Sequence, residues 1–539
     1  MENRKNNCQS RQFARKRPAE SDKTGRLPLV DVLLPTFNRP RRFSEALASV
    51  LKQTHTNLRV IIVNDGGRDV SQIVNAYNDS RVIFINRKEN CGKAYSLNEA
   101  LTYAEGKYIA YLDDDDLYYP EHIETLVNAL ETQPQFGAAY TDLYQVHSRL
   151  TPDGDRIILS KVLEVSRDFD RFVILYFNNV FHVSLMHRTG LLEKTGLYNE
   201  DLGVLIDWDM TRRLAFYTDF CHICQITGEY NTTEGESDRI SVRQRLDKQN
   251  YVSNALKIRT TRPPKPWPKI KDLSIILLAT RPDNDLAVTL GRIWQHTFYP
   301  YKLYLPMFRP WLEKINTEMP NLVLVPVDYQ AGETELLDAV LPQCQGEYVA
   351  VVPSSFDVRK FWLEDSLYAL INNRRRRQAF ELEHSNDGLW AAVLERQDLQ
   401  CARHSFGRLT LRESLEAAEI TMNKLLPEQI PFQFDQLLEQ AQVHERQGNY
   451  QQAAEIFEYI PEHYGNRLVM NALAAQAHFK AENLTRADEL INRLNRERPT
   501  VDTLLLEAKI RRRQKDFDAA LKLLEEARQI IKGKELIWI

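Results

Sequence analysis

Short apolar runs alternate with amphipathic stretches from Leu29 onward. The apolar runs have strand length and are rich in Val and Ile: "VDVLLPT", "LRVIIVND", "RVIFIN" and "KYIAYLD". The stretches between them, such as "RRFSEALASVLKQ" and "AYSLNEALTYAEG", have the amphipathic character of surface helices. Strands that alternate with helices in this way are typical of a parallel sheet covered on both faces. The pattern therefore predicts an α/β layer fold.

Polar residues follow the predicted strands. Thr36 and Asn38 follow the first strand, Asp65 the second, and the carboxylates Asp113 to Asp116 the fourth. Ligands of open parallel sheets bind beyond the carboxyl ends of the strands. We therefore expect these residues to lie at one ligand site.

The four consecutive carboxylates require compensation, because like charges at the end of a buried strand repel one another. Side chains alternate along a strand, so Asp113 and Asp115 point the same way and can share a divalent ion, which prefers oxygen ligands. A calcium loop is disfavoured because Tyr118 occupies the position where that loop needs glycine. A solvated acidic loop is the remaining alternative.

Four motifs, in this order, resemble those of the inverting glycosyltransferases of family 2, which have the nucleotide-binding fold called GT-A. They are "LLPTFNR", "LKQTHTNLRVIIVNDGG", "NCGKAYSLNEAL" and "GKYIAYLDDDDLYYPEHI", and the resemblance covers about 29–241. It implies Mn²⁺ or Mg²⁺ at Asp113 and Asp115. It implies nucleotide or donor contacts at Thr36, Asn38, Asp65, Gly92, Lys93, Asn98, Asp114 and Asp116. The last two could instead bind the following loop, and Asn64 stands where many members have a second aspartate.

A later stretch, "GLYNEDLGVLIDWDMTRRLA", resembles the part of that family that carries the general base. The resemblance implies that Asp207 removes the proton of the acceptor hydroxyl. Ile206 replaces the frequent glutamate, and a helix N-cap is the alternative or additional role for Asp207. The family also implies inverting transfer of a hexosyl-type sugar from a nucleotide-sugar, with a preference for uridine diphosphate. The acceptor would be a glycan, a lipid-linked molecule or a protein.

The sequence repeats itself after the Pro-rich linker at 260–269. Gly92, Gly106 and Tyr108 correspond, at a constant offset of 240, to Gly332, Gly346 and Tyr348. The repeat predicts a second GT-A-like domain at 270–400, but "PSSF" at 353–356 replaces the four carboxylates. We expect this domain to lack metal chemistry and to serve acceptor binding, assembly or packing.

Small residues recur at intervals of 33 or 34 in the last part of the chain. The alanines are Ala441, Ala475 and Ala508, then Ala453, Ala487 and Ala520, and the larger partners are Tyr450, Leu484 and Phe517. This period resembles that of tetratricopeptide repeats. It predicts a helical connector at 401–433 and helical repeats at 434–539. Such repeats would bind a protein partner, mediate self-association or act as a structural cap.

Charge and hydropathy exclude several classes of protein. Lys and Arg total 70 against 74 Asp and Glu, so no net positive charge favours nucleic acid. No apolar run approaches the roughly 20 residues that a membrane span needs. The basic segment 1–26 is predicted to be disordered. "RRRR" at 374–377 could contact a membrane surface or be a solvated helix end.

The six cysteines are scattered without framework spacing, which favours reduced thiols and a cytoplasmic protein, with peripheral contact at the inner face of the membrane as an option. "CHIC" at 221–224 has zinc or redox spacing. However, residues three apart on a strand point to opposite faces, and no second pair follows, so structural thiols are favoured. His182 and His187 are expected in the wall of the acceptor pocket or in the core.

Two classes of function therefore compete. The first is a metal-dependent glycosyltransferase with its catalytic domain at 27–259. The alternative is a non-catalytic scaffold, built on transferase folds and helical repeats, that binds glycans or proteins. The joint presence of Asp65, Asp113, Asp115 and Asp207 favours the enzyme.

Overall fold

The computed structural model describes residues 27–535, with gaps at 152–155, 164, 235–247, 283, 314, 316–318, 320, 374–376, 383–389, 426–432 and 465–466. The predicted disordered tail at 1–26 and most of the arginine run at 374–377 lie outside the described residues. Two compact units divide the chain. The first combines residues 1–254 with 437–539, and the second comprises 255–436.

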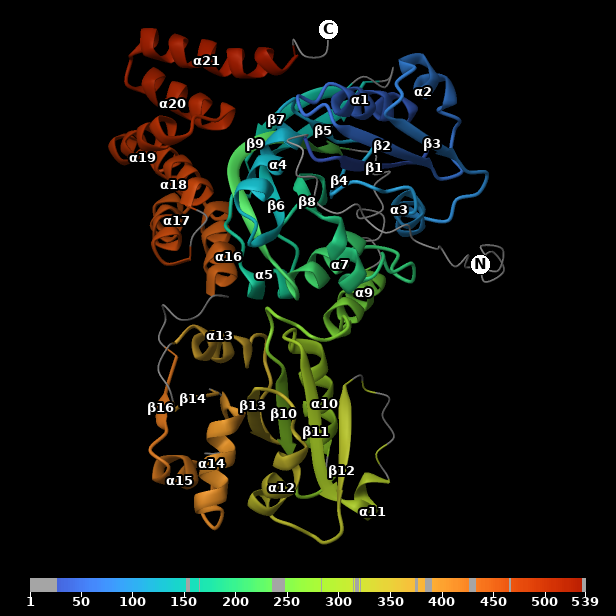
Figure 1. The fold of residues 1–539 in the computed structure, drawn as a ribbon. Coiled ribbons are helices and arrows are strands. Elements are labelled where there is room, and N and C mark those ends of the chain that lie inside the picture. The colour runs from blue at the N-terminus through green and yellow to red at the C-terminus, as the bar shows by residue number, and fades with distance from the viewer. Residues whose placement is uncertain are drawn as a thin grey trace. The chain divides into compact units, whose positions relative to one another are not determined.

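The first unit contains a mixed sheet that begins with four parallel strands (Figure 1). Their order is β3 (Val82–Asn86), β2 (Leu58–Asn64), β1 (Val30–Thr36) and β4 (Tyr108–Tyr111). The helices between them are α1 (Pro40–Leu51), α2 (Ser71–Tyr77) and α3 (Lys93–Leu101). This half of the sheet has the alternation of strands and helices that the sequence pattern predicts.

The sheet continues with further strands, of which the sequence indicates only the one around "CHIC". β8 (Leu185–Arg188) pairs antiparallel with β4 and with β6 (Phe136–Leu150), and β6 pairs parallel with β9 (Asp219–Glu234). β5 (Leu117–Tyr118) and β7 (Arg156–Val162) pair with β9 and β6. The helices of this half are α4 (His122–Thr132), α5 (Arg171–Tyr176), α6 (Leu192–Thr195) and α7 (Ile206–Ala215). The sheet is therefore mixed rather than wholly parallel.

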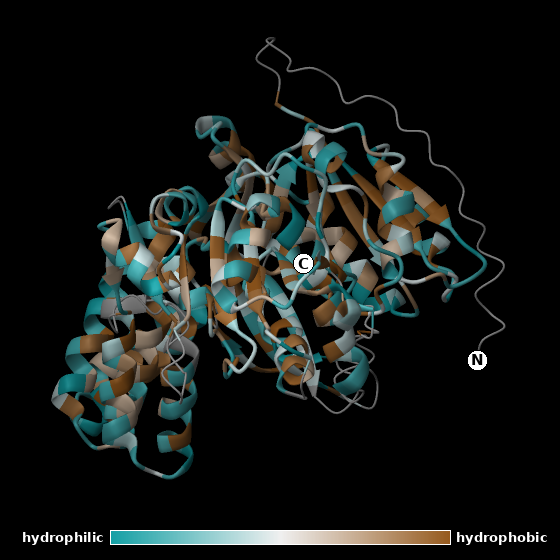
Figure 2. Ribbon diagram, turned by 90° about the horizontal axis from the view of Figure 1, so that it is seen from below, coloured by the Kyte–Doolittle hydropathy of each residue, from teal (hydrophilic) through white to brown (hydrophobic). Residues whose placement is uncertain are grey.

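One face of the sheet packs against α1 and α4. Val32 and Ile62 point to this face and lie in one core cluster with Phe43 of α1 and Leu126 of α4. The parallel strands are largely hydrophobic, whereas the helices alternate hydrophobic and hydrophilic residues (Figure 2). Pro40 stands at the start of α1, where its fixed φ suits a helix and its missing N–H costs nothing.

The second unit contains another α/β sheet, with the strand order β12-β11-β10-β13-β15-β14-β16. These strands are β10 (Leu273–Leu278), β11 (Tyr301–Phe308), β12 (Leu322–Val327), β13 (Tyr348–Pro353), β14 (Gln378–Glu381), β15 (Ala392–Glu395) and β16 (Thr421–Asn423). Its helices are α10 (Asn284–His296), α11 (Arg309–Leu312), α12 (Glu333–Val340), α13 (Glu364–Asn372), α14 (Arg396–Phe406) and α15 (Leu411–Ala417); α9 (Lys248–Thr260) precedes them. The expected boundary at 400 falls inside α14, because β16 completes the sheet through its pairing with β14.

The two sheets share their register as well as their strand order. Val30 is level with Leu58 and Tyr108 in the first sheet, and Leu273 is level with Tyr301 and Tyr348 in the second. This correspondence includes the predicted pair Tyr108 and Tyr348.

The glycine before that tyrosine also has equivalent contacts in the two sheets. The N–H of Gly106 donates to Asp31 Oδ2 at 2.6 Å, and the N–H of Gly346 donates to Ser274 Oγ at 3.0 Å. A Cβ at either glycine would lie less than 3.0 Å from backbone atoms. Close packing of backbones therefore requires glycine at both positions.

Six helices form the end of the chain. They are α16 (Gln433–Arg446), α17 (Tyr450–Tyr464), α18 (Arg467–Lys480), α19 (Leu484–Glu497), α20 (Val501–Arg513) and α21 (Phe517–Glu535). The six periodic alanines are all buried, since small side chains let neighbouring helices approach closely. Phe517, the larger residue of the last predicted repeat, is by contrast 59% exposed. The helical character of this region is confirmed.

These helices contact the first sheet through α20 and the residues before it. Val501 is buried in a small cluster with Tyr119, Tyr144 and Val146, and its N–H lies 3.4 Å from the Tyr144 hydroxyl. Arg498 Nη1 forms an ion pair with Asp142 Oδ2 at 2.6 Å. The compact unit is thus built from two segments distant in sequence.

Two further expectations concern membrane-spanning helices and the state of the cysteines. Among the residues that the structure describes, none of the helices is both long and apolar enough to cross a membrane. Cys221, Cys224, Cys344 and Cys401 are free thiols. Cys91 is disulfide-bonded, so the prediction of reduced thiols was wrong at that position.

Candidate active site

The four consecutive carboxylates form a turn rather than the end of a strand. β4 ends at Tyr111, and the N–H of Asp116 donates to the carbonyl of Asp113 at 3.2 Å. The strand alternation expected at these residues is therefore absent. Oxygens of Asp113, Asp115 and Asp116 can all lie within 4.8 Å of one another. Asp116 thus joins the predicted pair as a third potential metal ligand.

Two cations offset this negative charge. Lys93 Nζ lies 2.6 Å from Asp113 Oδ1, and Arg39 Nη1 lies 3.0 Å from both Asp114 Oδ1 and Asp115 Oδ2. Burial lowers the pKa of Lys93, but the charges of Asp113, Asp207 and Asp115 outweigh this and raise it far above its usual value. Lys93 therefore carries its positive charge at all ordinary pH values. The sequence motifs did not single out Arg39.

Asp114 forms hydrogen bonds with the end of β1 and the loop that follows it. Its Oδ2 accepts hydrogen bonds from Thr36 Oγ1 at 2.8 Å and from the Phe37 N–H at 3.2 Å. Burial and the neighbouring Asp115 raise the pKa of Asp114 to about 6, against the opposing charge of Arg39. The predicted donor contacts Thr36 and Asp114 therefore bind each other.

Asp65 organises the loop that leads into α3. Its carboxylate accepts hydrogen bonds from the N–H groups of Cys91 at 2.9 Å and Gly92 at 2.8 Å, and it pairs with Arg87 at 2.9 Å. Burial raises the pKa of Asp65, although these partners favour its charged form. Gly92 has a φ of +98°, which favours glycine. The salt bridge to Arg87 was not predicted.

Asn38 and Asn64 hold the neighbouring loop. Asn38 has a φ of +61°, and its Oδ1 accepts from the Arg68 N–H at 2.9 Å. Asn64 Nδ2 donates to the Arg68 carbonyl at 3.1 Å and to Asn86 Oδ1 at 2.9 Å. An aspartate at position 64 could not make these two donations. The departure from the family pattern therefore has a structural reason.

Asn98 connects α3 to the segment that precedes α7. Its Nδ2 donates to the Tyr198 carbonyl at 3.0 Å and to Glu200 Oε1 at 2.8 Å, and its Oδ1 accepts from the Tyr198 N–H at 2.8 Å. Both ends of this buried amide are engaged within the protein. These contacts give Asn98 a positioning role for the segment at 198–200, and its contact with the donor stays a prediction.

Asp207 lies in the first turn of α7 and is partly buried. Asn178 Nδ2 donates to its Oδ2 at 3.2 Å. Burial raises the pKa of Asp207, Lys93 opposes this, and Asp113 adds to it. Leu205, with a φ of +63°, occupies the N-cap position, so the expected N-cap role of Asp207 was wrong. The charges of Lys93 and Asp113 thus both act on Asp207.

His182 and His187 belong to a buried polar core next to this turn. His187 Nε2 lies 2.6 Å from the Tyr111 hydroxyl, and His182 Nε2 lies 2.8 Å from the Tyr198 hydroxyl. The rings of His182 and Tyr111 stack at 4.0 Å. Burial and the charge of Lys93 lower the pKa of His182 well below its usual value. Both histidines therefore pack behind the site.

The second unit contains the same turn but lacks its carboxylates. The N–H of Phe356 donates to the carbonyl of Pro353 at 3.1 Å, as the N–H of Asp116 does to Asp113. Phe356 is buried, and its ring lies 5.6 Å from that of Trp362. A hydrophobic contact thus replaces the carboxylates in this copy of the turn.

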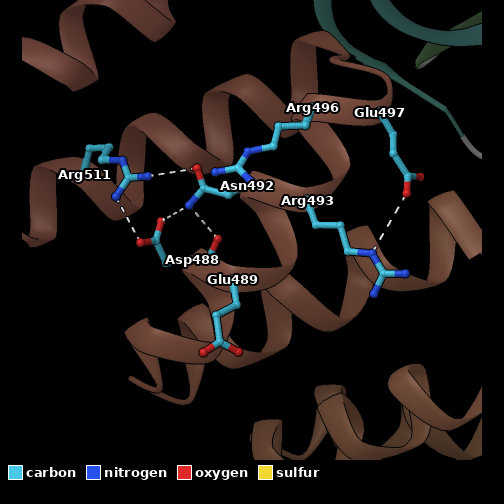
Figure 3. A pocket seen from close by; sticks show the side chains of 7 residues that line it. All are labelled: Asp488, Glu489, Asn492, Arg493, Arg496, Glu497 and Arg511. Atoms are coloured by element: carbon cyan, nitrogen blue, oxygen red, sulfur yellow. Dashed lines mark hydrogen bonds and ion pairs between the residues drawn. The ribbon is translucent and has the colours of Figure 1, made fainter.

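A pocket of about 530 Å³ lies in the helical region and shares no residue with the carboxylate turn. Asp488, Glu489, Asn492, Arg493, Arg496, Glu497 and Arg511 line it (Figure 3). Arg511 is held by Asp488 and Asn492, each at 3.0 Å. Several of these charged side chains pair with one another, as Arg511 does with Asp488. The volume of this pocket therefore does not by itself identify an active site.

Residues 31–189 match the family model described as "Glycosyl transferase family 2". An uncharacterized glycosyltransferase of Rickettsia typhi is 30% identical over 189 residues, which are 34% of this chain and 57% of that protein. One of Methanocaldococcus jannaschii is 30% identical over 34% of this chain and 63% of its own length. Hyaluronan synthase of Pasteurella multocida is 28% identical over 39% of this chain and 21% of that protein. The chain thus spans about three fifths of the first two relatives.

Two solved structures are similar to parts of the chain. Residues 1–349 of TarS from S. aureus are 19% identical, with a TM-score of 0.34 over 43% of this chain and 64% of that one. A mannosyltransferase from Pyrobaculum calidifontis is 20% identical, with a TM-score of 0.33 over 47% of this chain and 70% of that one. The family match covers the loop after β1, Asp65, α3 and the carboxylate turn. The match to this family is limited to residues 31–189.

Proposed function

We propose that residues 27–259 form a glycosyltransferase domain that moves a sugar from a nucleotide-sugar to an acceptor hydroxyl with inversion at the anomeric carbon. The observation that carries this proposal is the 2.6 Å ion pair of Lys93 with Asp113 of the carboxylate turn, both within the matched residues, together with the action of both charges on Asp207 from a third segment. A cation, a potential metal ligand and a half-buried carboxylate are the groups such a transfer requires.

Asp113, Asp115 and Asp116 would hold a divalent ion, Mn²⁺ or Mg²⁺. Their oxygens can come within 4.8 Å of one another, and hard ions favour such carboxylate ligands. When bound, the ion would neutralise charge on the diphosphate of the donor. Lys93, which pairs with Asp113, would be placed to bind a donor phosphate.

Asp207 would act as the general base. Its pKa is raised by burial, which makes the carboxylate a better proton acceptor than an exposed aspartate. Asn178 would orient it through the 3.2 Å hydrogen bond to Oδ2. The acceptor hydroxyl loses its proton to Asp207 as its oxygen attacks the anomeric carbon, and the leaving nucleotide diphosphate takes the bonding electrons.

The nucleotide would bind in the loops held by Asp65, Asn38 and Gly92, with uridine diphosphate preferred as the family resemblance implies. Relatives of the first domain include proteins named hyaluronan synthase and chondroitin synthase, which supports a glycan as acceptor. The second unit and the helical repeats would serve acceptor binding, a protein partner or self-association. The conversion of the repeated turn into a hydrophobic contact at Phe356 supports a non-catalytic second unit.

The proposal is tested by donor hydrolysis and Mn²⁺ binding in Asp113→Asn and Asp115→Asn variants of the full chain. Both variants should lose turnover and bind Mn²⁺ at least tenfold more weakly. Asp328→Asn is a matched control, because that exposed aspartate belongs to the second unit and pairs with Arg309. Unchanged Mn²⁺ affinity in both variants would refute the metal site. Absence of any nucleotide-sugar turnover by the wild-type chain would favour the scaffold alternative.

A further inference from the structure

A second group of potential metal ligands lies outside the carboxylate turn. His222 and Cys224 belong to β9, and Asp168 belongs to the segment before α5. One ligand atom from each of the three residues can be chosen so that all lie within 4.8 Å of one another. Cysteine, histidine and aspartate are the residues that bind zinc in proteins.

An irregularity in β9 brings Cys224 to this position. In the pairing of β6 with β9, Thr141 is level with Ile223 and Asp142 with Ile226. Cys224 and Gln225 are therefore extra residues that form a bulge, and bulges redirect side chains. Cys221 and Cys224 do not come together as a CxxC pair, but the bulge brings Cys224 to His222 instead, a combination that the sequence pattern did not consider. Cys224 is exposed and meets His222, whereas Cys221 is buried.

The distances suit a tetrahedral ion. Zinc lies about 2.0–2.3 Å from nitrogen, oxygen and sulfur ligands, which puts neighbouring ligand atoms roughly 3.5 Å apart. Cys224 Sγ lies 3.6 Å from His222 Nδ1. Asp168 Oδ1 lies 2.9 Å from the same nitrogen and would have to move away by roughly 0.5 Å. Its side chain is 92% exposed, so little opposes that movement.

The other side of the imidazole is already held as in known zinc sites. His222 Nε2 lies 2.8 Å from Asp142 Oδ1, and both side chains are almost fully buried. Metal-binding histidines usually donate their second ring N–H to a carboxylate, which fixes the ring for the metal. Asp142 Oδ2 in turn accepts from Ser166 Oγ at 2.8 Å and Arg498 Nη1 at 2.6 Å. The Tyr140 ring stacks on His222 at 4.9 Å.

We propose that Asp168, His222 and Cys224 bind a zinc ion through one oxygen, Nδ1 and Sγ, with the fourth position open to water or another ligand. The thiolate and imidazole favour zinc over the hard ions suited to the carboxylate turn. Binding releases the thiol proton of Cys224, and any proton on Nδ1, to solvent without a change in oxidation state. Because Asp142 contacts both His222 and Arg498, the ion would stiffen the contact between β9 and the helical region.

The test is calorimetric titration of the chelator-treated full chain with Zn²⁺. We expect a zinc site that Cys224→Ala and His222→Ala abolish and that Asp142→Asn weakens by about 10–100-fold. Cys401→Ala is the matched control, because Cys401 is also an exposed free thiol but lies in the second unit. The site should persist in Asp113→Asn, which separates it from the proposed catalytic metal.

Alkylation provides a second measurement that does not depend on any variant. Zn²⁺ should protect Cys224, but not Cys401, from iodoacetamide when modified peptides are quantified by mass spectrometry. Equal alkylation of Cys224 with and without Zn²⁺ would overturn the proposal. Zinc binding by folded Cys224→Ala with wild-type affinity would overturn it as well. His222 would then serve only to bridge Asp142 and Asp168 by hydrogen bonds.

Discussion

Lys93 Nζ lies 2.6 Å from Asp113 Oδ1, so a lysine at the start of α3 occupies the position where a metal would otherwise neutralise the carboxylate turn. The ammonium group and a divalent ion cannot both take the same Asp113 oxygens. Metal binding and release of Lys93 are therefore coupled under the proposed function.

Lys93→Met should separate these two effects. The ammonium group of Lys93 stabilises the ionised carboxylate of Asp113 from within about 4 Å, and Mn²⁺ has to displace it. Removal of this competing cation should therefore strengthen Mn²⁺ binding about tenfold or more. Turnover should fall at the same time, because the proposed phosphate contact is lost. Calorimetry with Mn²⁺ and a donor-hydrolysis assay measure the two quantities. Weaker Mn²⁺ binding in this variant would show that Lys93 supports the metal site rather than competes with it.

Asp207→Asn should lower kcat by about 10²–10⁴-fold and leave donor affinity nearly unchanged. In the wild type, burial raises the pKa of Asp207, so kcat/KM should rise with pH through a midpoint above the usual pKa of aspartate. That limb of the pH profile should disappear in the variant. Asn178→Ala should shift the midpoint without abolishing the limb, because Asn178 only orients the base. Activity within a few-fold of wild type would remove Asp207 from the mechanism.

Val501→Asp should loosen the helical region from the first sheet. The substitution puts a polar side chain without a hydrogen-bond partner into the apolar cluster around Tyr144, which costs at least about 1–3 kcal/mol even when the carboxyl group is protonated. Hydrogen exchange in α20 should then accelerate by about 10–100-fold. Leu505→Asp is the control on the same helix, because Leu505 is 37% exposed. Equal exchange in the two variants would mean that the cluster does not hold α20.

Glu364 should make the second unit sensitive to pH. It accepts hydrogen bonds from the N–H groups of Phe298 and Tyr299, yet complete burial raises its pKa to about 7. The folded state therefore holds a proton that the unfolded chain has lost between about pH 4.5 and 7. The free energy of unfolding therefore decreases as pH rises through this window, and Glu364 accounts for at most about 3 kcal/mol of the decrease.

Hydrogen exchange of the segment around Phe298, followed against pH, measures this contribution. Protection there should decrease between pH 4.5 and 7 in the wild type. In Glu364→Gln, which cannot ionise, the decrease should be absent. A decrease of the same size in both proteins would assign the pH dependence to another group.

The pattern of apolar and polar residues determined a large part of this fold. The strands from Val30 to Tyr111 and the six C-terminal helices follow from local periodicity, which reflects which face of each element is buried. The α/β class and the helical end of the chain are thereby confirmed. The correspondence of Gly106 with Gly346 was also visible, because close backbone approach demands glycine whatever surrounds it.

Other features were decided by contacts between segments distant in sequence. The carboxylates form a turn because Thr36 and Arg39 hold Asp114 and the Asn231 N–H holds Asp116. Asn98 is used by the protein itself, and the sequence motif could not reveal its partners at 198–200.

The bulge at Cys224 and the meeting of Asp142 with Arg498 also arise only in the tertiary structure. Local periodicity records which residues are buried, but it does not record which distant backbone they pair with. A residue inserted against one partner strand changes the direction of every side chain near it. The sequence alone therefore determined the elements and the residue types of the site, and tertiary pairing decided which of those residues meet.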